Sequence, residues 1–172
     1  RRLTSEFLGT LMMTVAGVML ISRANHLILL FLGLELVSIP TYVLLFVSRS
    51  SPRSSESTTK YFFLNILSSA VLLYGFSFLY GTAGTMILTG GAGIPGIRES
   101  LVQQLTSGNL PEPLLTVAVV LILGGLGFKV AAAPFHLYAA DVYQGTSNAT
   151  AGLLSVIPKI AGLVGLVRVL AI

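Results

Sequence analysis

Residues 26–47 read HLILLFLGLELVSIPTYVLLFV, and this stretch gives the clearest indication of the fold class. Its side chains are almost all apolar, and its only carboxylate is Glu35. A helix needs about 20 consecutive apolar residues to cross roughly 30 Å of hydrocarbon. The stretch therefore predicts a transmembrane helix that carries a glutamate near its middle.

The same length criterion predicts an all-α, polytopic transmembrane bundle of about five spans. The predicted spans are residues 3–21, 26–47, 60–80, 114–143 and 150–170. The fourth is expected to break at residues 131–134, because Pro134 lacks a backbone donor and disfavours helix in the residue before it. Glycines in the spans offer small surfaces for close helix approach, at positions 33, 75, 124, 125, 127, 162 and 165. All of this is predicted to form one domain, residues 1–172.

The segments between the spans are polar. Residues 48–57 read SRSSPRSSES and predict a turn-forming linker outside the lipid. Residues 81–113 are rich in Gly, Ser, Thr and Pro and predict the one long extramembrane loop, in which residues 97–105 form an amphipathic patch suited to the membrane surface. The chain lacks an initiating methionine and stops directly after an apolar helix, so we expect a piece of a longer protein.

Composition excludes a water-soluble fold and several kinds of site. The chain is 54% hydrophobic and 9% charged with a mean hydropathy of +0.90, whereas soluble domains are roughly 25% charged. Cysteine is absent, which excludes disulfides and thiolate ligands. The net charge of +4 is spread over loops and helix ends, so no nucleic-acid surface is predicted. No nucleotide loop, metal-ligand spacing or catalytic triad occurs, so neither a metal nor a cofactor site is predicted in this chain.

The basic residues predict an orientation. Five crossings place the N-terminus, residues 48–57 and residues 141–147 on one side of the membrane. That side holds Arg1, Arg2, Arg49, Arg53 and Lys60, and the other holds Arg23, Arg98 and Arg168. Because basic residues accumulate on the cytoplasmic side, the first side is predicted to be cytoplasmic.

Three ionisable residues stand inside predicted spans: Glu35, Lys129 and Lys159. A charge at the bilayer centre costs about 2.5 kcal/mol or more, so it normally faces the bundle interior and marks an ion or substrate path. Since all three stand near mid-span, we expect one buried layer of charges. A buried lysine holds its proton beside a carboxylate and tends to lose it when unpaired, which suits a proton relay from Lys129 to Lys159. The alternative is a fixed Glu35–Lys129 ion pair that only helps two helices pack.

Other side chains near the expected break have two interpretations. His136 is either a further relay group, because an imidazole exchanges protons near neutral pH, or a hydrogen-bond partner for backbone groups freed at Pro134. Asp141 is expected to cap a helix or lie in a loop, and Lys60 to extend to the interface. Tyrosines are expected at the membrane interface or in packing, at positions 61, 74, 80, 138 and 143.

Five short motifs resemble a known family, the antiporter-like proton-pumping membrane subunits of respiratory complex I. The motifs are LGLELVS at 32–38, KYFFL at 60–64, GFKVAAAPFHLY at 127–138, DVYQG at 141–145 and SVIPK at 155–159. Within that family the chain is most similar to the N-type subunits, known in mitochondria as subunit 2. It departs from them at Tyr138 and Ala140, where tryptophan and proline are usual, and residues 145–149 lack the customary prolines.

The resemblance implies a fold, a site and partners. It places this chain at helices four to eight of the family subunit, the first of two inverted repeats. Glu35, Lys129 and Lys159 fall on the family's glutamate and two lysines that form the first half of a proton channel. NADH, flavin, iron–sulfur clusters and quinone are implied in partner subunits, with no cofactor in this chain. The implied partners are the other membrane subunits of complex I, the lipid bilayer and protons, in a bacterial inner membrane.

The function expected from the sequence is therefore a non-redox, proton-translocating subunit of an NADH:quinone oxidoreductase, an enzyme whose catalytic chemistry lies elsewhere. One alternative is an Mrp-type cation/proton antiporter subunit, which would use the same residues. Another is a purely structural membrane scaffold, for which Lys129→Ala would leave proton translocation intact.

Overall fold

The structure is a computed structural model that describes residues 2–47, 52–91 and 93–172. Arg1 and Arg49, on which the predicted orientation partly depends, lie outside the described residues, as do the side chains of Arg2 and Arg53. Over the described ranges the regular structure is helical, which confirms the all-α prediction. The helices are α1 Arg2–Arg23, α2 Leu27–Val47, α3 Pro52–Ala83, α4 Ile97–Thr106, α5 Glu112–Val130, α6 Leu137–Gln144 and α7 Asn148–Leu170.

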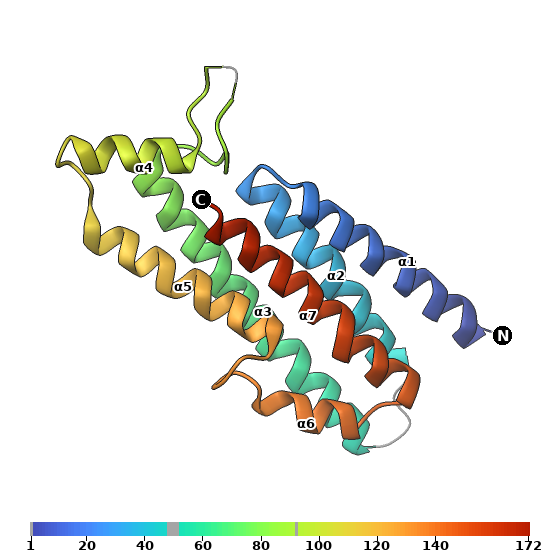
Figure 1. The fold of residues 1–172 in the computed structure, drawn as a ribbon. Coiled ribbons are helices and arrows are strands. Elements are labelled where there is room, and N and C mark those ends of the chain that lie inside the picture. Colours follow the sequence, from blue (N-terminus) through green and yellow to red (C-terminus); the bar gives the residue numbers. More distant parts are fainter. Residues whose placement is uncertain (1, 48–51, 92) are drawn as a thin grey trace.

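Five of these helices are long and apolar enough to cross a membrane: α1, α2, α3, α5 and α7. They run side by side, with α1 packed on α2 and α3 packed on α5, while α7 contacts α1, α2 and α5 (Figure 1). The N-terminus, the start of α3 and α6 lie at one end of the bundle. The C-terminus and α4 lie at the other end (Figure 1). The described part of the chain therefore contains the expected number of spans, and its cytoplasmic side stays a prediction.

The beginning of α3 differs from the prediction. Residues 52–57 were assigned to a turn-forming linker, which is wrong, because the helix begins at Pro52. Proline suits the first turn of a helix, and the Thr58 hydroxyl donates to the carbonyl of Ser54 at 2.8 Å. The helix has 32 residues and is therefore about 48 Å long, against roughly 30 Å of hydrocarbon. Its polar first turns can thus be helical and still lie beyond the lipid.

Glycines let the paired helices approach closely. A Cβ on Gly125 of α5 would lie 2.7 Å from the Cβ of Leu72, and one on Gly75 of α3 would lie 2.8 Å from Cγ1 of Ile122. The predicted role is confirmed at these positions. It is wrong for Gly124, where a Cβ would meet nothing within 4 Å.

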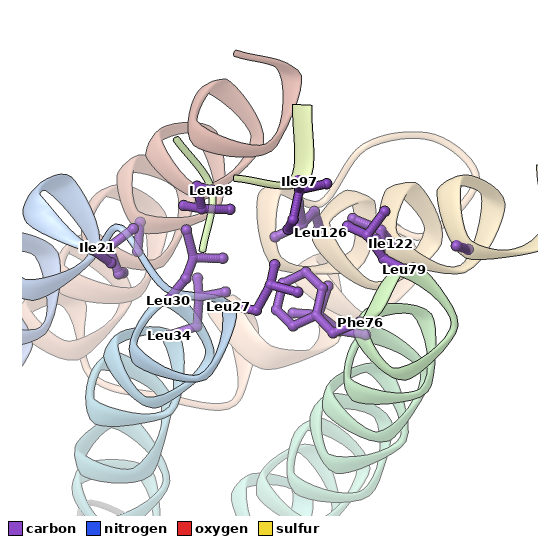
Figure 2. Packing of buried hydrophobic residues seen from close by; sticks show 14 of the residues in the cluster. Ile21, Leu27, Leu30, Leu34, Phe76, Leu79, Leu88, Ile97, Ile122 and Leu126 are labelled. Atoms are coloured by element: carbon purple, nitrogen blue, oxygen red, sulfur yellow. The ribbon is translucent and has the colours of Figure 1, made fainter. Parts of the chain in front are cut away.

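The main apolar core lies toward the end of the bundle that carries α4. There Leu27, Leu30 and Phe76 of the long helices meet Leu88 and Ile97 from the long connection (Figure 2). The connection is tied to the α1–α2 turn, since the Asn25 amide donates to the Thr89 carbonyl at 2.9 Å and accepts from the Thr89 amide at 3.0 Å. This end of the bundle is therefore closed by both packing and hydrogen bonds.

The helix break lies where the sequence predicts it. Helix α5 ends at Val130, and Ala131 adopts a left-handed φ of 59°. The amide of Ala131 donates to the Phe128 carbonyl at 2.9 Å and that of Ala132 to the Gly127 carbonyl at 2.8 Å, which satisfies carbonyls that the helix end leaves open. Helix α6 follows and packs on the first half of α3. That α6 completes the membrane crossing stays a prediction.

Candidate functional site

A buried ammonium group lies where α2, α3 and α5 meet. The side chain of Lys129 is only 4% exposed, and its Nζ lies 3.1 Å from Oε1 of Glu35. The same nitrogen donates to the hydroxyls of Ser38 and Ser69, each at 2.9 Å, and to Oδ1 of Asn65 at 3.4 Å. Two of the three charges predicted to share a buried layer are therefore in direct contact.

The spacing of polar residues on three helices builds this group, which we call the Lys129 cluster. Glu35 and Ser38 lie one turn apart on α2, and Asn65 and Ser69 lie one turn apart on α3. Residues three or four apart share one face of a helix. Each helix thus directs two polar groups at Lys129, which stands in the last turn of α5 before the break.

The Lys129 cluster satisfies one buried positive charge. An ammonium group has three N–H donors, and here four acceptors surround it. Ser69 also donates to Oε1 of Glu35 at 2.5 Å, so the carboxylate receives a neutral hydrogen bond as well as the charged one. Buried charges are tolerated when they are paired and hydrogen-bonded. Displacement of Glu35 would remove the one opposite charge that the described residues place beside Lys129.

The second predicted amine stands apart on α7. Lys159 Nζ donates to the Tyr143 hydroxyl at 2.5 Å and to the Leu154 carbonyl at 2.9 Å, and lies 5.1 Å from the centre of the Tyr143 ring. The described residues place no carboxylate within ion-pair distance of Lys159. The three charges therefore form one ion pair and one lysine that neutral groups hold.

A proline in α7 leaves one backbone carbonyl free to accept a hydrogen bond from Lys159. In a helix, each backbone N–H normally donates to the carbonyl four residues earlier. Pro158, inside α7, has no N–H, so the carbonyl of Leu154 lacks its helical donor. Lys159 donates to that carbonyl. The amine is thus placed by an irregularity of its own helix.

His136 and Asp141 lie apart from Lys129 and Lys159. His136 is exposed in the connection between α5 and α6, and the hydrogen bonds of Lys129 and Lys159 go to other residues. The Phe128 carbonyl at the break accepts from the Tyr138 hydroxyl at 3.2 Å, so Tyr138 takes the role of backbone partner considered for His136. A relay role for His136 stays a prediction. Asp141 forms an exposed ion pair with Lys60 at 3.5 Å.

Sequence reasoning missed the neutral partners of both lysines. Ser38, Asn65 and Ser69 are buried polar residues in otherwise apolar helices, and their three- or four-residue spacing was a usable signal. Tyr143 was assigned to packing or the interface. It lies on a different helix from Lys159, so helical spacing could not have indicated the contact.

Five helices that are long and apolar enough to cross a membrane, with a buried carboxylate–ammonium pair where three of them meet, define a class, the multi-span membrane proteins that bury a charged pair. Residues 24–172 match the family model of the transmembrane region of NADH:quinone oxidoreductases and Mrp antiporters. The chain belongs to this family.

Individual relatives show which members of the family this chain is similar to. The chain is 37% identical over 168 residues to NADH-quinone oxidoreductase subunit N of Francisella tularensis subsp. holarctica, which covers 96% of this chain and 33% of the relative. It is 38% identical over 169 residues to F(420)H(2) dehydrogenase subunit N of Methanosarcina mazei, and this alignment covers 98% of this chain and 32% of the relative.

A solved structure gives the same result for the fold. The chain is similar to part of respiratory complex I from Thermus thermophilus with bound aureothin, with a TM-score of 0.75 and 34% identity over 95% of this chain and 34% of that one. The chain thus spans about a third of the length of the relatives that it matches.

Proposed function

We propose that this chain is the proton-translocating part of a membrane subunit of an NADH:quinone oxidoreductase, in which Glu35, Lys129 and Lys159 relay protons. The observation that carries the proposal is the Lys129 side chain, 4% exposed and 3.1 Å from Glu35 inside an apolar bundle. Such charges normally mark an ion path. A purely structural role does not account for Lys159, because a second amine without a carboxylate adds a desolvation cost and no ion pair.

The relay follows from the different surroundings of the two lysines. When Glu35 withdraws from Lys129, the ammonium loses the opposite charge that offsets its desolvation, and its proton becomes transferable. The proton then passes toward Lys159. His136, in the connection between α5 and α6, is a further candidate relay group. Redox energy comes from partner subunits, on which we place NADH, flavin, iron–sulfur clusters and quinone.

The names of the relatives support a proton path that is separate from the electron donor. One relative is named for NADH and another, of nearly equal identity, for F(420)H(2). The part that they share with this chain therefore suits a module that does not bind the donor. We place it among the other membrane subunits of the complex, in a bacterial inner membrane.

The test is proton pumping per NADH oxidised, in closed membrane vesicles that contain the assembled complex. Lys129→Ala and Lys159→Ala should each abolish pumping through this subunit while the complex stays assembled. The matched control is Arg98→Ala, because Arg98 is an exposed cation on α4, at the end of the bundle away from α6. Unchanged pumping in both buried-lysine variants would refute the proposal. Dependence of transport on sodium would favour the Mrp-type alternative.

A further inference from the structure

The two partners of Lys159 differ in what they can offer the amine. An ammonium group only donates hydrogen bonds, whereas a neutral amine also has a lone pair that accepts one. The Leu154 carbonyl can only accept. A tyrosine hydroxyl both donates and accepts, and its hydrogen rotates freely about the C–O bond. Of the two partners, Tyr143 alone can reverse its hydrogen bond when Lys159 gains or loses a proton.

We propose that Tyr143 is a further relay residue next to Lys159, with a hydroxyl that accepts from the ammonium and donates to the neutral amine. The inference rests on the proposed function, because it concerns the same relay. In the transfer, an N–H bond of the Lys129 ammonium breaks, the Tyr143 oxygen takes up the released proton on the side away from Lys159, and the hydroxyl releases its own proton to Nζ. An N–H bond forms, one O–H bond replaces another, and tyrosine leaves the step unchanged.

The position of Tyr143 depends on the broken segment rather than on α7. Tyr143 stands on α6, which docks on α3 through the Asp141–Lys60 ion pair at 3.5 Å. At the end of α6, Gly145 lies so close to α3 that a Cβ would be 2.5 Å from Oγ of Ser57. Contact between Tyr143 and Lys159 therefore requires α6 to be docked.

The same segment connects the two lysines. Lys129 is the second-last residue of α5, the break follows, and α6 then carries Tyr143. Tyr61 of α3 is 5% exposed and lies in one buried cluster with Phe128 of α5 and Tyr138 of α6, and Tyr143 packs against this cluster. A rearrangement beside Lys129 can thus reach Tyr143 along the chain and through these buried side chains.

Tyr143→Phe tests this role, because it removes the hydroxyl and keeps the ring that packs beside Lys159. The assay is again proton pumping per NADH oxidised, normalised to assembled complex in closed vesicles. We expect at least about a ten-fold loss, since hydrogen bonds to charged groups contribute about 1.5–3 kcal/mol. The matched control is Tyr138→Phe, on the same short helix, whose hydroxyl bonds a backbone carbonyl. It should pump as the wild type does.

The amount of assembled complex separates a role in proton transfer from packing. If Tyr143 acts on the proton at Lys159, Tyr143→Phe assembles as the wild type does and loses pumping. Loss of assembly instead would overturn the inference, because the tyrosine would then act through packing. Wild-type pumping in Tyr143→Phe, with pumping lost in Lys129→Ala, overturns this inference and leaves the proposed function standing. Wild-type pumping in Lys129→Ala and Lys159→Ala overturns both.

Discussion

Replacing Glu35 by glutamine would remove the negative charge from the Lys129 cluster while retaining a side chain of the same size with an acceptor oxygen. The ammonium would keep its neutral partners Ser38, Asn65 and Ser69. The substitution therefore isolates the contribution of the opposite charge. We expect a large loss of stability, because a buried charge would lose its counter-charge.

The magnitude follows from the burial of the two partners. Removing one partner of a buried ion pair costs about 3–5 kcal/mol, whereas neutral hydrogen bonds between membrane helices average about 0.6 kcal/mol. The Glu35 side chain is 19% exposed and three neutral acceptors remain, so we expect the lower end, about 3 kcal/mol. Lys129→Met should cost a similar amount, because it leaves the carboxylate unpaired. The double variant buries no charge and should cost no more than either single variant.

The assay is equilibrium unfolding of the 172-residue chain in mixed detergent micelles, for the wild type, both single variants and the double variant. The expected coupling free energy is at least about 3 kcal/mol, because the double variant should lose no more stability than one single variant. The control is Glu56→Gln, which breaks the 2.7 Å pair with Lys60 whose side chains are 64% and 50% exposed. It should cost less than about 1 kcal/mol. If Glu35→Gln costs as little as the control, or if the double variant is additive, the ion-pair argument fails.

Three further predictions test the packing, the long connection and the docking of α6. Gly125→Ala should destabilise the chain by about 1–3 kcal/mol in the same unfolding assay, because its Cβ would overlap the facing helix, whereas Gly124→Ala should be neutral or slightly stabilising. The Glu99 carboxylate accepts from its own backbone amide and from that of Gly96, which holds its pKa below the usual 4.5. A lowered native pKa means that the stabilisation is present above about pH 4.5 and is lost as the pH falls through the native value. The protection factor of the Gly96 amide against hydrogen exchange should therefore fall on acidification, and Glu99→Gln should remove that dependence. Asp141→Asn should cost less than about 1 kcal/mol, and the difference from the wild type should vanish at high salt.

The fold was predictable because one physical requirement dominates it. A helix satisfies its backbone groups internally and can therefore lie in lipid, so an apolar stretch of about 20 residues indicates a span. The break at residues 131–134 was predictable for a similar local reason, since Pro134 restricts its neighbour. The start of α3 was missed because polarity was taken as evidence against helix. Serine and threonine hydroxyls instead bond carbonyls of the preceding turn, as Thr58 does with Ser54.

The charged residues of the site were predictable, and the tyrosine partner of Lys159 was not. An isolated Glu or Lys inside an apolar stretch stands out in any single sequence, because its burial is costly. The contact of Lys129 with Glu35 required only that both face the interior at one depth. The contact of Lys159 with Tyr143 depends on how α6 folds back after the break. The direction in which α6 runs is set by its packing on α3, which no local sequence pattern encodes.

The difference between the two lysines follows from the kind of partner that each one has. A carboxylate beside Lys129 stabilises only the charged amine, so a proton held there is released by moving Glu35. If Lys159 also had a carboxylate beside it, a carboxylate would have to move away from each lysine before a proton could pass. With a hydroxyl and the Leu154 carbonyl instead, Lys159 can change charge without losing either partner. In the proposed relay one moving carboxylate is then sufficient, and this asymmetry predicts that Glu35 controls when a proton leaves Lys129 while the Tyr143 hydroxyl controls how fast it reaches Lys159.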